Sequence, residues 1–214
     1  MDMAIRIWNS RDIHLSKSLS WLLRHGAIKE GLKISSEGYV DVNSILQHKS
    51  LRGRFNKADV ERVVQTNDKQ RFHLRANPQT GVLEVKANQG HSLPQVTNAG
   101  LIQIIEPKYT TVVHGTYLKC WQQIKLDGLS RMSRQHIHFA KGTLEDSSVI
   151  SGLRKNIEIY IFIDLKKALK DDIEFFESEN QVVLCPGNRD GYLKPKYFSK
   201  VIKVQSGMIL FKYV

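Results

Sequence analysis

The strongest constraint on the fold is a change in the spacing of apolar residues near residue 70. Before it, apolar residues recur at the three-to-four-residue interval of helices. After it, residues 71–75 alternate between polar and apolar side chains, as a half-buried strand does. A turn signal at residues 77–81 and a second apolar run at residues 82–85 complete a hairpin. Helices followed by a β-hairpin predict a winged-helix-like lobe over residues 1–92.

Three helices are predicted ahead of this hairpin. The first spans residues 14–25, and we expect it to end at Gly26, because glycine readily adopts the left-handed conformation that stops a helix. Asp41 and Asn56 are predicted N-caps of the second and third helices. Their side-chain oxygens can accept hydrogen bonds from the first backbone N–H groups of a helix.

The rest of the chain is predicted to be a second lobe of α+β class. Residues 93–107 contain Pro94 and Gly100 and are predicted to be a linker, which leaves residues 108–214 for the second lobe. The predicted strands lie at residues 111–113, 136–139, 157–163, 182–184 and 201–204, and the predicted helices at residues 120–124 and 165–169.

The charge predicts a polyanionic partner. The chain has 32 Lys and Arg against 21 Asp and Glu, a net charge of +11, and clustered cations gain affinity by displacing counterions from phosphates. The two cysteines form no CxxC pair, which predicts an intracellular protein of a reducing compartment, cytoplasm or nucleus. No apolar run is long enough to span a membrane, so we expect no membrane partner.

Two basic motifs of the first lobe each allow two interpretations. Arg24 and His25 end the first helix, where cations oppose the negative end of the helix dipole, but where they can also project toward a bound anion. Arg71, His73 and Arg75 share one face of the first hairpin strand. That face is either an ordinary solvated surface or a site of contact with a nucleic-acid backbone.

The second lobe carries three further candidate motifs. Residues 114–116 follow an apolar strand and form a compact polar turn, which is either an ordinary capping turn or a usual position for a ligand group. Arg134, His136 and His138 share one face of a strand by period-two alternation. The two histidines also suit a metal, but no carboxylate or cysteine motif completes a site, so we expect no metal. The glycine-containing loop at residues 150–154 can admit a ribose or a base but matches no dinucleotide fingerprint.

Taken in order, these motifs resemble one family. The segments are LSKSLSWLLRHGA, NDKQRF, VKANQGHS, VVHGT, RQHIHFA, ISGLR and PGNRDGYLKPKYF. Together they resemble the tRNA 2′-phosphotransferase family from about residue 13 to about residue 200. The resemblance implies that the first lobe binds RNA, and that the second has the ADP-ribosyltransferase fold and binds NAD as a co-substrate.

The resemblance also implies site residues. The implied catalytic tetrad is Arg24, His25, Arg71 and Arg134. The implied NAD contacts are His114, Gly115, Thr116, His138, Ser151 and Gly152, with His136 left open beside His138. We expect Lys69, Gln89 and His91 to contact the RNA, and we expect the protein to act as a monomer.

The implied reaction has two steps. The 2′-phosphate of the RNA attacks C1″ of the nicotinamide ribose and expels nicotinamide. The ribose 2″-hydroxyl then attacks phosphorus, which releases RNA with a 2′-hydroxyl and ADP-ribose 1″,2″-cyclic phosphate. Guanidinium groups suit this chemistry because they bind phosphate oxygens bidentately and stay charged at any working pH. His25 can either bind the phosphate or protonate the leaving 2′-oxygen.

Two other functions fit parts of the sequence. The first is an ADP-ribosyltransferase that acts on terminal nucleic-acid phosphates and stops after the first step. The second is a winged-helix RNA-binding module without catalysis, which explains the charge and the first lobe. This second alternative leaves His114, the paired histidines and the glycine-containing loops of the second lobe unexplained.

Overall fold

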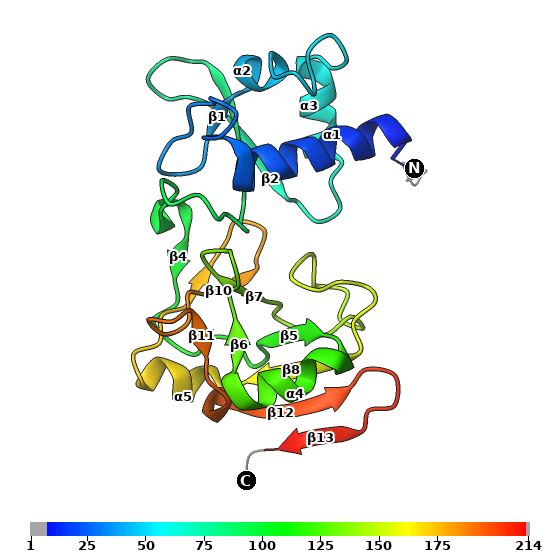
Figure 1. The fold of residues 1–214 in the computed structure, drawn as a ribbon, viewed down its shortest axis with the longest axis vertical. Coiled ribbons are helices and arrows are strands. Elements are labelled where there is room, and N and C mark those ends of the chain that lie inside the picture. Colours follow the sequence, from blue (N-terminus) through cyan, green and yellow to red (C-terminus); the bar gives the residue numbers. More distant parts are fainter. Residues whose placement is uncertain (1–7, 213–214) are drawn as a thin grey trace. The chain divides into compact units, whose positions relative to one another are not determined.

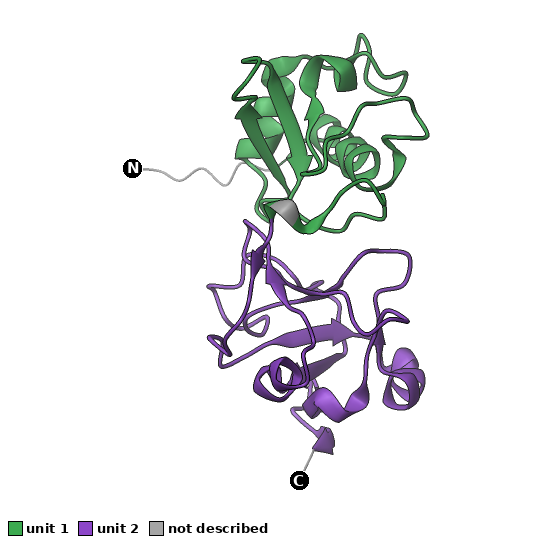
Figure 2. Cartoon of the chain, turned by 90° about the vertical axis from the view of Figure 1, so that its left-hand side faces the viewer, with its two compact units in different colours: residues 1–100 green, residues 101–214 purple. Residues whose placement is uncertain are grey.

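The chain consists of two compact units. The computed structural model describes residues 8–212, and the division falls between a first unit, residues 1–100, and a second unit, residues 101–214 (Figure 2). Each unit has its own apolar core. Both combine helices with antiparallel sheets, so the predicted α+β class is confirmed.

The first helix starts earlier and ends differently than predicted. Helix α1 (Ser10–Trp21) begins at the cap residue Asn9 and runs directly into a π-helical turn, Leu22–Gly26 (Figure 1). The prediction that Gly26 stops the helix in the left-handed conformation is wrong, because Ala27 after it keeps right-handed angles, φ −47° and ψ −53°. The glycine is needed for space instead: an added Cβ would lie 2.5 Å from Cζ3 of Trp21.

The other two predicted caps are confirmed. Helix α2 (Val42–Leu46) begins after Asp41, whose carboxylate accepts hydrogen bonds from the backbone of the first turn. Helix α3 (Lys57–Gln65) begins after Asn56 in a reciprocal capping box with Asp59. Both caps depend on residues within three positions of each other, which is why the sequence pattern finds them.

The predicted hairpin is also confirmed, and a third strand joins it. Strand β2 (Phe72–Ala76) pairs antiparallel with β3 (Leu83–Ala87), with Phe72 opposite Ala87. The two-residue strand β1 (Val40–Asp41) pairs with the other edge of β3. The core between this sheet and the helices is formed mainly by leucine, isoleucine and valine side chains.

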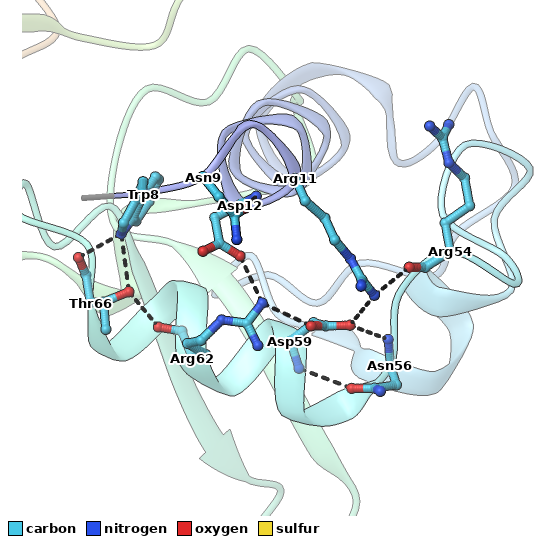
Figure 3. A network of polar contacts seen from close by, with 9 residues as sticks. All are labelled: Trp8, Asn9, Arg11, Asp12, Arg54, Asn56, Asp59, Arg62 and Thr66. Atoms are coloured by element: carbon cyan, nitrogen blue, oxygen red, sulfur yellow. Dashed lines mark hydrogen bonds and ion pairs between the residues drawn. The ribbon is translucent and has the colours of Figure 1, made fainter. Parts of the chain in front are cut away.

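A network of two buried carboxylates and two partly exposed arginines connects α1 to α3 (Figure 3). Arg62 Nη2 donates to Asp12 Oδ1 at 2.7 Å and to Asp59 Oδ1 at 2.8 Å. Arg11 Nη2 donates to the other oxygen of Asp59 at 2.9 Å. Burial raises the pKa of the Asp59 carboxyl, but hydrogen bonds from Arg62 and Asn56 and the charge of Arg11 outweigh it, so the pKa lies below its ordinary value.

The second unit is built from two four-stranded antiparallel sheets and one strand pair. Their orders are β13-β12-β8-β5, β4-β9-β10-β7 and β11-β6. The elements are β4 (Ile102–Gln103), β5 (Val113–Thr116), α4 (Leu118–Asp127), β6 (Leu129–Ser130), β7 (Ile137–Phe139), β8 (Ile159–Ile163), α5 (Leu165–Lys170), β9 (Phe176–Glu177), β10 (Val183–Cys185), β11 (Tyr192–Leu193), β12 (Phe198–Lys203) and β13 (Ile209–Lys212).

Each strand predicted for the second lobe has a counterpart, with boundaries shifted by a few residues. The apolar run at residues 111–113 forms a strand only from Val113 onward. The segment predicted as a linker, residues 93–107, divides between the units: Leu93 packs with Ala27 in the first, whereas β4 pairs with β9 in the second. Among residues 8–212, no helix is long and apolar enough to cross a membrane.

The Asp59 network gives a test of the first unit's stability. We expect Asp59→Asn to lower the free energy of unfolding by about 2 kcal/mol at pH 7, because a buried carboxylate with charged donors loses its charge. Since the pKa of Asp59 is depressed in the folded state, this stabilisation is present above its unfolded pKa and disappears as the pH falls through the folded value. The loss should therefore shrink toward zero at low pH.

Chemical denaturation followed by circular dichroism at a series of pH values measures this effect. Glu61→Gln is the matched control, because the Glu61 carboxylate is half exposed and only reaches Lys57 at 3.8 Å. That control should change stability by no more than about 0.5 kcal/mol. An Asp59→Asn effect independent of pH would contradict the assigned role of the charge.

Candidate functional site

A pocket of the first unit collects three of the four predicted catalytic residues. Its volume is about 480 Å³. It is lined by Trp8, Ile13, Ser16, Lys17, Ser20, Trp21, Arg24, His25 and Arg71. The helix end and the start of the hairpin therefore contribute to one site, although they are far apart in the sequence.

The π-helical turn explains how two consecutive side chains, Arg24 and His25, both reach this pocket. The backbone N–H of Ala27 donates to the carbonyl of Leu22 at 2.8 Å, which spans five residues instead of four. Leu22 and Leu23 at the start of the turn are fully buried and anchor it in the core. Wide turns of this kind are rare and occur frequently at functional sites.

Ser92 positions His25 from the far end of the hairpin. Its Oγ lies 2.8 Å from Nδ1 of the imidazole, and its backbone N–H donates to the carbonyl of Arg24 at 2.9 Å. The hydroxyl also lies 3.5 Å from that carbonyl. When the hydroxyl donates to the carbonyl, its oxygen accepts from Nδ1–H of His25. In that arrangement Nδ1 of the imidazole carries a proton.

Two asparagines hold Arg71. Asn67 Oδ1 accepts from the backbone N–H of Arg71 at 3.1 Å and from its Nη1 at 3.3 Å. Asn88 donates from its backbone N–H to the Arg71 carbonyl at 2.9 Å and from Nδ2 to the carbonyl of Gln70 at 2.7 Å. Burial lowers the pKa of the Arg71 guanidinium, and the charge of Asp68 opposes that shift. A guanidinium remains charged under these conditions.

The segment after the hairpin packs against Arg24. Gly90 has φ +92°, and an added Cβ would lie 3.3 Å from Nε of Arg24, so the backbone approaches this side chain closely. The predicted RNA contacts Gln89 and His91 on either side of it are buried, and Lys69 is half-buried. None of these three lines the pocket. Their contacts with RNA stay predictions.

The basic strand face proposed from the sequence is largely neutralised. Arg75 donates to Glu84 at 2.6 Å and to Glu37 at 2.8 Å, and its guanidinium lies 3.7 Å from the ring centre of Tyr39. These two carboxylates raise the pKa of Arg75. His73 Nδ1 lies 2.7 Å from the Tyr39 hydroxyl. Of the three residues on this face, Arg71 is therefore the one that serves the pocket.

The second unit brings together the residues predicted to bind NAD. Val113 of β5 and Ala140 after β7 exchange two backbone hydrogen bonds of 2.9 Å. One residue further, Nδ1 of His114 lies 2.9 Å from the carbonyl oxygen of His138. A carbonyl only accepts, so Nδ1 carries the proton and Nε2 is an acceptor. Burial lowers the pKa of His114 below its ordinary value, which keeps the imidazole neutral at neutral pH.

Close glycine packing completes this cluster. Gly152 has φ +101°, and an added Cβ would lie 3.0 Å from Cα of Ala140. An added Cβ on Gly115 would lie 2.5 Å from Cδ1 of Ile157. The loop that carries Ser151 therefore packs directly against the ends of β5 and β7. The predicted residues 114–116, His138 and Ser151–Gly152 are thus neighbours within one unit.

Arg134 lies just before β7, in the same unit. Its backbone carbonyl accepts a hydrogen bond from Nη1 of Arg131 at 2.8 Å. Burial lowers the pKa of the Arg134 guanidinium, and the charge of Arg154 lowers it further. Arg154 also lowers the pKa of His114. This exposed arginine ends the ISGLR segment and is a cation near both residues, which the sequence analysis did not single out.

His136, the alternative to His138, is a buried and neutral side chain. Burial and the nearby charge of Arg131 lower its pKa to about 4. Its ring packs edge-on against Phe176 with centroids 5.9 Å apart. Between residues 8 and 212, no group of three or more His, Cys, Asp or Glu side chains is arranged to hold a metal ion.

Comparison with known proteins decides the family. The model of the RNA 2′-phosphotransferase, Tpt1 / KptA family matches residues 10–187. The chain belongs to this family. It is 48% identical to tRNA 2′-phosphotransferase 1 of Danio rerio, over 92% of this chain and 88% of that protein. It is also 48% identical to tRNA 2′-phosphotransferase 1 of Homo sapiens, over 91% of this chain and 77% of that protein.

The likeness extends to a relative of lower sequence identity. The chain is 39% identical to tRNA 2′-phosphotransferase of Saccharomyces cerevisiae, over 82% of this chain and 79% of that protein. As a member of the RNA 2′-phosphotransferase family, the chain is a transferase. The matched range includes the predicted site residues of both units and three further residues that the structure adds: Asn67, Ser92 and Arg154.

The contact between Ser92 and His25 can be tested without an activity assay. We expect nitrogen NMR of the imidazole to find the Nδ1-protonated tautomer of His25 in the unaltered protein, because Ser92 Oγ can accept from that atom while its hydroxyl donates to the carbonyl of Arg24. Ser92→Ala removes the acceptor, so both tautomers should be populated, whereas Ser92→Thr should restore the original one. Identical tautomer populations in all three proteins would contradict the positioning role of Ser92.

Proposed function

We propose that this protein transfers the 2′-phosphate of RNA to NAD, giving RNA with a 2′-hydroxyl, nicotinamide and ADP-ribose 1″,2″-cyclic phosphate. The proposed substrate is the splice-junction 2′-phosphate of tRNA. The observation that carries the proposal is the pocket in which Arg24, His25 and Arg71 meet, within a family whose relatives are named tRNA 2′-phosphotransferases. The pocket combines cationic donors suited to a phosphate.

The proposal gives each unit a role. The first unit, with three helices followed by a hairpin, would be a winged-helix lobe that binds RNA. The second, with its antiparallel sheets, would be an ADP-ribosyltransferase-type lobe that binds NAD as a co-substrate, with no metal. We further propose a monomer acting in a reducing intracellular compartment. Its two cysteines, Cys120 and Cys185, are both free, in keeping with such a compartment.

The cluster around His114 fits a dinucleotide chemically. Its Nε2 is an acceptor suited to a ribose hydroxyl, because Nδ1 donates to the carbonyl of His138. Arg134 and Arg154 supply positive charge suited to a pyrophosphate. NAD would supply an electrophilic C1″ with a good leaving group and the adjacent 2″-hydroxyl. In the proposed assignment, His114, Gly115, Thr116, His138, Ser151 and Gly152 bind it.

The chain's own residues would act mainly by electrostatics. A 2′-phosphate is already anionic, so the first step needs orientation and no strong base. In the second step negative charge gathers on the oxygens around phosphorus. Arg24 and Arg71 would bind these oxygens, and each preorganised donor can stabilise such a transition state by about 3 kcal/mol. His25, held by Ser92, would donate a proton from Nε2 to the leaving 2′-oxygen. Arg134, which belongs to the second unit, is the fourth residue of the proposed catalytic set.

The decisive experiment uses an oligonucleotide with an internal 2′-phosphate. Incubated with the protein and NAD, it should lose that phosphate, and mass spectrometry should identify the cyclic phosphate of ADP-ribose. Accumulation of ADP-ribosylated RNA without this product would favour transfer that stops after the first step. Binding of the oligonucleotide without any conversion would leave only an RNA-binding module.

Arg71→Ala separates the two proposed binding sites. We expect it to slow phosphate removal at least 100-fold, because one preorganised cationic donor is lost from the phosphate. NAD affinity, measured by calorimetry, should stay largely unchanged. Arg52→Ala, which removes an exposed arginine of the same unit, is the matched control and should keep full turnover. Loss of NAD affinity with retained turnover in Arg71→Ala would contradict the assignment.

A further inference from the structure

The pocket of the first unit contains more than a phosphate needs. Lys17, Arg24 and Arg71 provide positive charge, but Trp8 and Trp21 also line the same pocket. A phosphate alone gains nothing from large aromatic rings. A nucleotide, by contrast, combines an anionic group with a flat apolar base, and a pocket of both kinds of side chain complements it.

Trp21 is held beside the catalytic residues by close packing. Three adjacent atoms of its six-membered ring, Cζ3, Cη2 and Cε3, lie 2.5, 2.6 and 2.8 Å from the Cβ that a side chain at Gly26 would have. Because these three distances are similar, the face of the ring, and not its edge, packs against Gly26. The indole therefore rests on the same π-helical turn that carries Arg24 and His25.

The rest of the indole is accessible. Trp21 is 44% exposed, although it lines the pocket and belongs to a helix whose neighbouring leucines are fully buried. Trp21 and Arg24 line the same pocket, so the distance between the indole and the guanidinium is at most the width of that pocket. One nucleotide can span this separation with its phosphate at Arg24 and its base at Trp21.

Trp8 has a different role in the pocket. Its Nε1 donates to the backbone carbonyl of Thr66 at 3.0 Å and lies 3.1 Å from the Thr66 hydroxyl (Figure 3). These bonds hold Trp8 at the end of α3, where its half-buried side chain forms one side of the pocket. Trp21 is the more exposed of the two rings, which makes it the better platform for a ligand.

We propose that Trp21 stacks on a nucleobase of the RNA within one nucleotide of the 2′-phosphate. This inference rests on the proposed function, since it adds a base subsite to the proposed phosphate site. Stacking on an indole accepts every base, because each base has a flat π face. The subsite therefore adds affinity for a nucleotide without reading the sequence, and it distinguishes an RNA phosphate from free phosphate.

Equilibrium binding without NAD tests the subsite separately from turnover. Fluorescence anisotropy of a labelled 2′-phosphorylated oligonucleotide should give about tenfold weaker binding for Trp21→Ala, within the range that one stacked base contributes. Trp21→Phe should retain most of the affinity, because a smaller aromatic ring still stacks. Ile28→Ala is the matched control: Ile28 is 46% exposed in the same unit but does not line the pocket.

Abasic oligonucleotides provide the second arm, which uses the unmodified protein. Removing the bases on both sides of the 2′-phosphate should weaken its binding about tenfold. Trp21→Ala should bind the abasic and complete oligonucleotides equally. Equal affinity of the unmodified protein for both would overturn the proposal, even where Trp21→Ala proved poorly folded. Turnover of the complete oligonucleotide by the unmodified protein judges the proposed function separately.

Discussion

The candidate site of the first unit depends on the π-helical turn Leu22–Gly26, which ends in a backbone hydrogen bond from the N–H of Ala27 to the carbonyl of Leu22. This bond widens the last turn of the first helix, and the buried Leu22 and Leu23 anchor that turn in the core. In a regular α-helix, successive side chains diverge by about 100°. The wider turn lets two successive residues, Arg24 and His25, line one pocket, and Gly26 gives room for the ring of Trp21.

The register of the hairpin supplies the supports of this turn. Because Phe72 pairs with Ala87, the residues just before β2 lie opposite those just after β3. Asn88 therefore reaches the backbone of Arg71, and the chain continues past Gly90 to Ser92, which contacts Arg24 and His25. A shift of one residue in this pairing would turn every side chain of the strand to the other face. The register thus holds a cation and an imidazole at one pocket.

In the second unit, close backbone packing of short strands positions the candidate residues. The paired hydrogen bonds between Val113 and Ala140 place His114 against the carbonyl of His138. Gly115 and Gly152 then let the following loop approach without a side chain between them. The histidine is kept neutral by burial, which suits an acceptor of hydrogen bonds better than a cation.

Local hydrogen bonding explains what the sequence by itself determined. The caps at Asp41 and Asn56 and the hairpin all depend on residues close together in the chain, and so does the α+β class. The order of the family's motifs sufficed to indicate family membership. Strands of two residues, such as β1 and β9, leave no periodic pattern and were missed.

Only the tertiary structure decided which polar residues work together. Ser92 is an ordinary polar residue until the hairpin brings it to His25, 67 positions away in the sequence. Arg75 shares a strand face with Arg71, but it is neutralised by Glu37, a residue distant in the sequence. Gly26 resembled a helix stop and instead makes space for Trp21. Spacing along a chain predicts local hydrogen bonds, whereas the partners of a side chain are chosen by long-range packing.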